Sequence, residues 1–209
     1  MNIRYKMRPR CNPQNDYLEI NSDLKYNQYG EAVVGNVFNT DGTIKVEIYL
    51  SDYLINKTNH RFMYFCVNEK NYLTDSYIVI NKYFYDNLID NSFLWTLIWH
   101  EIGHFHSLPF VLDNSKVSVY EQRMENILAG KIMIDEQLAD LFAVYARGKD
   151  EFIRALKWGR AGVKNLPPSF NTNLAIREYN NRIRYIKQID EKNAIDIFNE
   201  LLEEHRIRD

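Results

Sequence analysis

The sequence predicts an α+β protein, with a small mixed sheet before Asn81 and a mostly helical C-terminal part. Two alternating apolar runs, residues 32–38 and 44–50, flank the turn pair Asp41-Gly42, a pattern typical of a β-hairpin. Beyond Asn81 the apolar residues recur at steps of three and four, which is the spacing of helices. The strands therefore precede the helices along the chain, as in α+β folds.

Length and composition predict an ordinary globular protein with one catalytic site. The chain has 209 residues, 45% of them hydrophobic, and a net charge of -2. The near-zero charge gives no overall attraction to nucleic acid or to anionic membranes, so we expect no nucleic-acid partner. No apolar run reaches the roughly 18 residues that span a bilayer, so we expect no membrane insertion.

Two cysteines without a CxxC pair exclude a disulfide framework. The abundance of Asn, Ile, Lys and Tyr suggests an AT-rich genome, such as that of a bacterium or a bacteriophage. We expect a cytoplasmic protein, or a virion component if a phage encodes it.

Two more apolar runs, residues 62–67 and 77–80, predict two further strands, which makes about four in all. The next segment predicts a helix of about four turns that starts after the N-cap candidates of residues 90–92 and ends at Pro109. Its core-facing stripe consists of Leu94, Ile98, Ile102 and Phe105.

Three later helical segments are expected. One starts at Ser118, where Glu121 completes a capping box, and ends near Gly130. The next runs from Asp135 as N-cap to Gly148 as a left-handed stop. The remainder is helical with a break at Pro167-Pro168, and its last forty residues predict a helical hairpin. We expect a domain of residues 1–150 and a helical extension of residues 151–209 packed on it. Expected apolar positions in the last helices are Tyr179, Ile183, Ile186, Ile197, Leu201 and Leu202.

The motif that carries chemistry is HExxH at residues 100–104. Residues four apart lie on one helix face, so the imidazoles of His100 and His104 can converge on one metal ion. Glu101 lies about 100° further round the helix, where it can reach a water molecule on the metal and act as general base. Two imidazoles and an oxygen donor suit zinc.

A catalytic zinc site needs a third protein ligand. The metzincin pattern fails because Ser107 and Phe110 stand where Gly and His are required, and neither cysteine has the context of a peptide deformylase ligand. Glu136 is the better candidate, and Asp140, one turn later, can orient a ligand imidazole from behind. Two alanines, Ala139 and Ala143, allow this helix to approach the HExxH helix closely.

HEIGH followed by ExxAD resembles the gluzincin metallopeptidases, and is most similar to the compact ImmA/IrrE-like and phage-encoded zincins. The resemblance covers about residues 77–147. It implies a zincin-like fold, in which a small mixed sheet packs on the HExxH helix. It also implies His100, His104 and Glu136 as zinc ligands, Glu101 as the base and Asp140 as a supporting residue.

Zincins hold the substrate backbone along an edge strand, which would be residues 77–80 or alternatively 62–67. The oxyanion needs a stabilising group, and the residues considered are His106, Tyr120, Tyr145 and Arg147, of which Tyr145 and His106 are preferred. We expect His106 either at the surface or in contact with a metal ligand without binding the metal itself. The remaining basic stretches predict solvated faces rather than a binding site: they are Arg4, Lys6, Arg8, Arg10, Arg177, Arg182, Arg184 and Lys187.

The leading hypothesis is a zinc-dependent metalloendopeptidase that hydrolyses a protein or peptide substrate through Glu101. A second hypothesis is a zincin-fold structural or assembly component, for example of a bacteriophage virion. Its metal site would be retained or vestigial, and its partners would be neighbouring protein chains. A third is a regulator that cleaves a repressor, as the ImmA resemblance implies.

Overall fold

The structure is a computed structural model, and it falls into two compact units, Asn12–Ser92 and Phe93–Asp209 together with Met1–Cys11. The predicted boundary after residue 150 stays a prediction. The structure describes residues 17–20, 23–28, 31–38, 44–51, 63–66, 77–82, 85, 91–111, 119–165 and 167–204.

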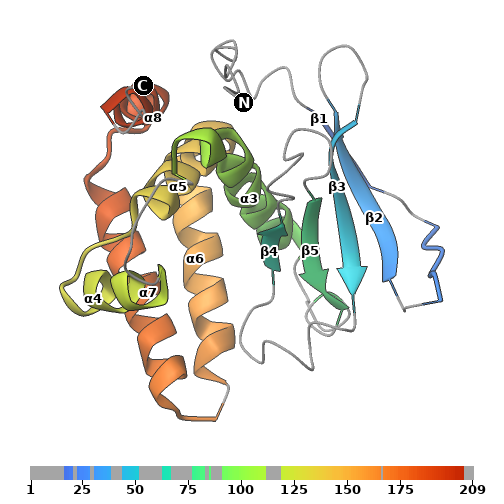
Figure 1. The fold of residues 1–209 in the computed structure, drawn as a ribbon, viewed down its shortest axis with the longest axis horizontal. Coiled ribbons are helices and arrows are strands. Elements are labelled where there is room, and N and C mark those ends of the chain that lie inside the picture. Colours follow the sequence, from blue (N-terminus) through green and yellow to red (C-terminus); the bar gives the residue numbers. More distant parts are fainter. Residues whose placement is uncertain are drawn as a thin grey trace, which may run out of the picture. The chain divides into compact units, whose positions relative to one another are not determined.

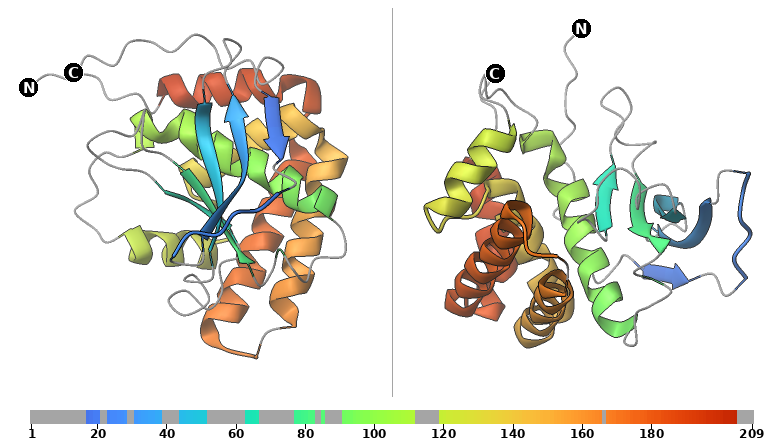
Figure 2. Two further views of the ribbon diagram at one scale, coloured as in Figure 1. Left: turned by 90° about the vertical axis from the view of Figure 1, so that its right-hand side faces the viewer. Right: turned by 90° about the horizontal axis from the view of Figure 1, so that it is seen from below.

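The first unit contains a mixed five-stranded sheet (Figures 1 and 2). Its order is β1-β2-β3-β5-β4, in which only β3 and β5 pair in parallel. The mixed sheet is confirmed, and it has one strand more than expected, because β1 pairs outside the predicted hairpin. The strands are β1 (Tyr17–Ile20), β2 (Glu31–Phe38), β3 (Ile44–Ser51), β4 (Met63–Cys66) and β5 (Tyr77–Asn81).

The predicted hairpin is the antiparallel pair β2–β3. Its turn, with Asp41 and Gly42, lies outside the described residues. Alternation along β3 is as expected, since Val46, Ile48 and Leu50 are buried while the side chains between them are partly exposed.

The first choice of edge strand, residues 77–80, is wrong. β5 pairs with β3 on one side and with β4 on the other, so its backbone groups already have partners. Three consecutive residues of β5, from Ile78 to Ile80, are buried, which is typical of an interior strand. The alternative, residues 62–67, contains β4, which is an edge of the sheet.

The second unit is helical, as the spacing of its apolar residues predicts. Among the described residues no helix is both long enough and apolar enough to cross a membrane. The elements are α3 (Asn91–Val111), α4 (Val119–Leu128), α5 (Ile134–Arg147), α6 (Lys149–Lys164), α7 (Phe170–Gln188), the short η2 (Glu191–Asn193) and α8 (Ala194–Glu204).

The structure differs from the sequence predictions at three helix ends. α3 does not end at Pro109 but continues to Val111, so the proline lies in the last turn of the helix. α5 begins at Ile134 after Met133, which makes no side-chain cap, and Asp135 lies in the first turn, where its charge favours the helix instead. Gly148 has a positive φ of 87° but a ψ of 150°, so it is not left-handed helical.

The break at Pro167-Pro168 is confirmed, and it separates α6 from α7, which lie side by side (Figure 1). The hairpin expected in the last forty residues is wrong, because α8 packs against α5. Phe198 of α8 is fully buried, and its ring centroid lies 5.8 Å from that of Phe142. The three apolar residues expected to cover the core from α8 are only partly buried: Ile197, Leu201 and Leu202.

Candidate metal centre

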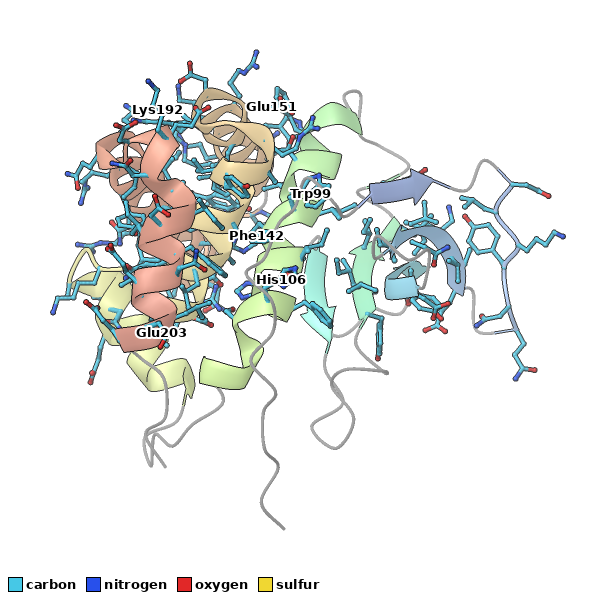
Figure 3. All side chains as sticks on the ribbon, turned by 90° about the horizontal axis from the view of Figure 1, so that it is seen from above. Trp99, His106, Phe142, Glu151, Lys192 and Glu203 are labelled. Atoms are coloured by element: carbon cyan, nitrogen blue, oxygen red, sulfur yellow. The ribbon has the colours of Figure 1, made fainter. Side chains whose placement is uncertain are left out.

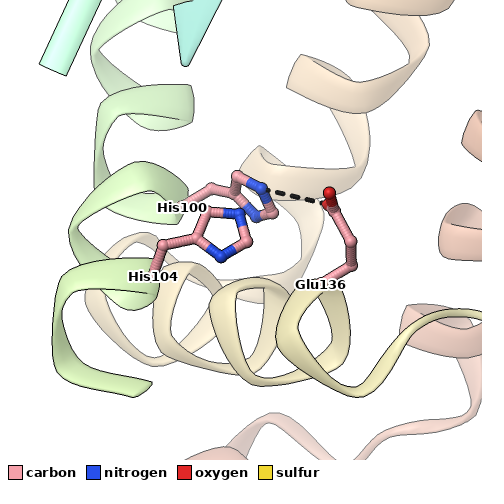
Figure 4. Close-up of side chains that lie close together, drawn as sticks. All are labelled: His100, His104 and Glu136. Carbon is pink, nitrogen blue, oxygen red and sulfur yellow. Dashed lines mark ion pairs between the residues drawn. The ribbon is translucent and has the colours of Figure 1, made fainter. Parts of the chain in front are cut away.

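The side chains of His100, His104 and Glu136 converge in the helical unit (Figure 4). α3 carries the two histidines and α5 carries the glutamate. One potential ligand atom from each residue lies within 4.8 Å of the other two. The structure thus brings together the three residues that the sequence suggests as zinc ligands.

A glycine allows α3 and α5 to approach this closely. A Cβ on Gly103 would lie 2.7 Å from Cα of Ala139 and 2.9 Å from its carbonyl oxygen, both far inside contact distance. Ala139 and Ala143 are fully buried, as the expected close approach requires. Because Gly103 lies between the two histidines, the helix contact occurs beside the ligand cluster.

The two histidines lie one turn apart on α3, with ring centroids separated by 4.7 Å. His100 is buried and His104 is partly exposed. The predicted apolar stripe is buried at Ile98, Ile102 and Phe105, while the side chain of Leu94 lies outside the described residues. Burial of this stripe fixes the helix rotation and so directs both imidazoles toward α5.

Asp140 lies one turn after Glu136 on α5, with its side chain fully buried. One of its oxygens, Oδ1, is 2.8 Å from Nδ1 of His100. A carboxylate at this nitrogen stabilises the tautomer with hydrogen on Nδ1 and leaves the Nε2 lone pair for a metal. Nε2 of His100 faces Glu136, whose Oε2 is 3.3 Å away.

The two carboxylate oxygens of Glu136 have different surroundings. Oε1 accepts a hydrogen bond from Arg123, whose Nη2 is 3.1 Å away and also donates to Glu178 at 2.6 Å. Oε2 is buried and has no hydrogen-bond partner among the described residues. Its nearest charged neighbours, His100 Nε2 and Arg182 Nη1, are both at 3.3 Å. A buried carboxylate oxygen without a hydrogen bond is costly unless cations lie near it. Arg182 supplies one positive charge at Oε2, and a metal ion bound by the two imidazoles would supply a direct ligand bond.

The donor set fits zinc. Two imidazoles and one carboxylate are the protein ligands of the His₂Glu class of catalytic zinc sites, which leave a fourth position for water or substrate. Oε2 of Glu136 accepts no hydrogen bond among the described residues and lies 3.3 Å from Nε2 of His100, and a ligand atom of His104 lies within 4.8 Å of a ligand atom of each. Monodentate binding through Oε2 would leave the hydrogen bond of Oε1 with Arg123 intact.

In the metal-free site the charged side chains shift one another's pKa. Burial opposes the charge of Glu136, but the positive charge of Arg182 and the nearby imidazole of His100 hold the pKa of this carboxyl well below its ordinary value. Burial and Arg182 also oppose protonation of His100, yet Asp140 and Glu136 outweigh them and raise its pKa to about 9. Burial and the neighbouring His100 lower the pKa of His104. A bound metal ion would take the place of the proton on His100.

Glu101 lies next to His100 on α3, and its side chain is partly exposed. The geometry therefore leaves the expected base accessible to water. Tyr145, on α5, is also partly exposed, and its suggested role at the oxyanion stays a prediction. Of the other two residues considered for that role, Arg147 pairs with Glu151 at 2.6 Å, and the side chain of Tyr120 lies outside the described residues.

His106 is not at the surface, which was the first of the two places expected for it, and the other place, next to the metal ligands, stays a prediction. It is 6% exposed, and its ring centroid lies 4.7 Å from that of Phe142 and 5.5 Å from that of Phe105 (Figure 3). Two residues past His104, its side chain falls on a part of α3 that packs into the core of the helical unit. The ligand cluster does not include it.

Sequence reasoning missed Arg123, which bonds to Glu136, and the buried Arg182. The basic stretch of α7 was expected to be solvated, and this is correct for Arg177, Arg184 and Lys187 but wrong for Arg182. Its side chain is 10% exposed and bonds to Asp140. The available signal was its position within the apolar stripe, between Tyr179 and Ile186.

Comparisons with protein-family models, curated proteins and solved structures found no match to this chain. The assignment of the metal centre therefore rests on the geometry of its own residues.

Proposed function

We propose that this protein is a zinc-dependent metallopeptidase of the gluzincin type, with a zincin-like fold. The observation that carries the proposal is the convergence of His100, His104 and Glu136, with a buried oxygen of Glu136 left without a hydrogen bond. The α+β composition and the HExxH sequence on α3 support it. Packing of the sheet on α3, which a zincin-like fold requires, is part of the proposal.

In this proposal each residue of the centre has a separate task. His100, His104 and Glu136 would hold zinc, which supplies Lewis-acid activation of the scissile carbonyl and of water. Glu101 takes a proton from the attacking water on its carboxylate and passes it to the leaving amine. Asp140 holds the ring of His100 by its Nδ1 atom, so the other ring nitrogen stays available as a ligand.

A second candidate is a structural or assembly component, for example of a bacteriophage virion, in which the metal site is vestigial. The observation that favours it is that much of the charge in the site is balanced without metal. Arg182 pairs with Asp140 and lies 3.3 Å from Glu136, which Arg123 also contacts. On this alternative the protein would contact neighbouring chains in the particle, whereas the peptidase would act in the cytoplasm or from the virion.

A cleavage assay separates the two candidates. The zinc-loaded full chain is incubated with a peptide library, and the products are identified by mass spectrometry. The control variants are Glu101→Gln, which removes the base, and Glu125→Gln, which alters an exposed glutamate on α4. The peptidase proposal expects products with wild type and Glu125→Gln and none with Glu101→Gln. Equal cleavage by all three proteins would show that Glu101 is not the base.

A further inference from the structure

We infer that Arg182 of α7 is a positioning residue of the metal centre, which acts on the ligand His100 through Asp140. The inference rests on the proposed zinc site and extends it to a helix outside the HExxH and ExxAD segments. It also makes the helical C-terminal part a component of the centre rather than an appendage.

The contact between Arg182 and Asp140 is a two-point contact. Nε of Arg182 donates to Oδ2 of Asp140 at 3.0 Å, and Nη2 donates to Oδ1 at 2.5 Å. The side chain of Asp140 is fully buried and that of Arg182 is 10% exposed. A bidentate contact fixes the plane of the carboxylate as well as its position, and burial protects it from competition by water.

The orientation of this carboxylate decides what His100 can do. Oδ1, which Nη2 of Arg182 holds, is the same oxygen that lies 2.8 Å from Nδ1 of His100. Nη2 of Arg182 also contacts the imidazole directly, at 3.1 Å from Nδ1 and 3.4 Å from Nε2 of His100. With Oδ1 fixed as acceptor, the hydrogen of His100 is kept on Nδ1, and the lone pair of Nε2 is left for the metal. If Asp140 rotated, the ring would lose both its tautomer preference and its orientation.

The aromatic ring of Tyr179, on the same helix, packs beside the guanidinium of Arg182. The guanidinium carbon lies 5.9 Å from the ring centroid of Tyr179, one turn earlier on the same helix. Tyr179 itself packs closely on α6, since its hydroxyl would lie 2.8 Å from a Cβ on Gly159. The close α6–α7 contact therefore places the arginine that holds Asp140.

The shape of the guanidinium matters in addition to its charge. A lysine at position 182 would keep the positive charge near Asp140 and Glu136, but it cannot make two parallel hydrogen bonds to one carboxylate. Arg182→Lys thus separates charge balance from orientation, and it avoids leaving Asp140 as a buried carboxylate without a cation.

The test measures the zinc dissociation constant of the full chain by competition with a chromophoric chelator. Four proteins form a double-mutant cycle: wild type, Arg182→Lys, Asp140→Asn and the double variant. Arg160→Lys is the matched control, because Arg160 links α6 to α7 through a 2.6 Å bond to Asn180, and neither residue belongs to the ligand cluster. Circular dichroism of each metal-free protein checks that it is folded.

We expect Arg182→Lys and Asp140→Asn each to weaken zinc binding by about 10- to 100-fold. This is the usual effect of removing a residue that hydrogen-bonds to a metal ligand and orients it. The double variant should bind zinc about as weakly as Asp140→Asn alone, because both changes break the same link. Arg160→Lys should bind zinc as wild type does.

Three results would overturn the inference. They are wild-type affinity in Arg182→Lys, wild-type affinity in Asp140→Asn, or losses that simply add in the double variant. If Arg182→Lys does not fold, wild-type affinity in Asp140→Asn would still overturn the inference. These outcomes leave the proposed function intact when wild type binds one zinc ion. A folded wild-type protein that binds no zinc would instead overturn the proposed function together with this inference.

Discussion

Gly103 of α3 and Ala139 of α5 are so close that a Cβ on Gly103 would lie 2.7 Å from Cα of Ala139. The close atoms on α5 include backbone atoms, which cannot turn aside as a flexible side chain can. This contact lies between His100 and His104, so it sets the distance from both imidazoles to Glu136. The small residue at position 103 is therefore a requirement of the metal centre as well as of helix packing.

Replacing Gly103 by alanine should destabilise the protein by about 1–3 kcal/mol, the usual cost of overpacking a core, and should weaken zinc binding. The matched control is Gly162→Ala on α6, where a Cβ would meet nothing within 4 Å. That change should be neutral or should stabilise the helix by up to about 1 kcal/mol. Urea unfolding of the metal-free proteins measures both. Equal stability of Gly103→Ala and wild type would contradict the close contact.

The general base has its own prediction. Glu101→Gln should lower turnover by at least about 100-fold, because the amide cannot accept the proton of the attacking water. Zinc content should stay at the wild-type level, since Glu101 lies outside the ligand cluster. Activity assays and metal analysis on the same preparation check the two parts together. Loss of metal along with activity would show that Glu101 supports the ligands instead of the chemistry.

Packing of α8 on α5 predicts that Phe198 stabilises the helical unit. Phe198 is fully buried against Phe142, so Phe198→Ala should lower the free energy of unfolding by about 3–5 kcal/mol. Ile197→Ala, at a partly exposed neighbouring position, should cost clearly less. Denaturant unfolding compares the two variants. A larger loss in Ile197→Ala would mean that Ile197, and not Phe198, makes the main packing contact of α8.

Removal of zinc should destabilise the protein. An ion that binds only the folded chain adds stability that grows with its concentration, by about 4 kcal/mol at 1,000 times the dissociation constant. Chelation should therefore lower the thermal midpoint of wild type. His100→Ala, which lacks a ligand, should show no such change on chelation. If chelator does not change the thermal midpoint of wild type, the site does not bind zinc tightly.

The sequence predicts those residues of the metal centre whose positions follow from the geometry of a single helix. The HExxH spacing places His100 and His104 on one face of a helix, and the geometry of α3 alone guarantees it. Glu136 and Asp140 follow from ligand chemistry and from a single further helix. Arg182 could not be placed in this way, because its contact with His100 joins residues 82 positions apart and depends on how α7 packs.

The sheet shows the same division. Alternating apolar residues locate β2 and β3, since alternation is a property of each strand. The interior position of β5 depends instead on its parallel pairing with β3, which no local pattern specifies. The continuation of α3 past Pro109 likewise shows that a proline in the sequence does not by itself fix where a helix ends.

The most direct test of the metal centre is the zinc content of the purified full-length chain, measured by inductively coupled plasma mass spectrometry. Wild type is compared with His100→Ala and Glu136→Ala, and with Glu125→Ala as an exposed control. We predict one zinc ion per chain in wild type and in the control, and a lost or weakened ion in both ligand variants. A folded wild-type protein without metal, or full zinc content in Glu136→Ala, would contradict the proposed site.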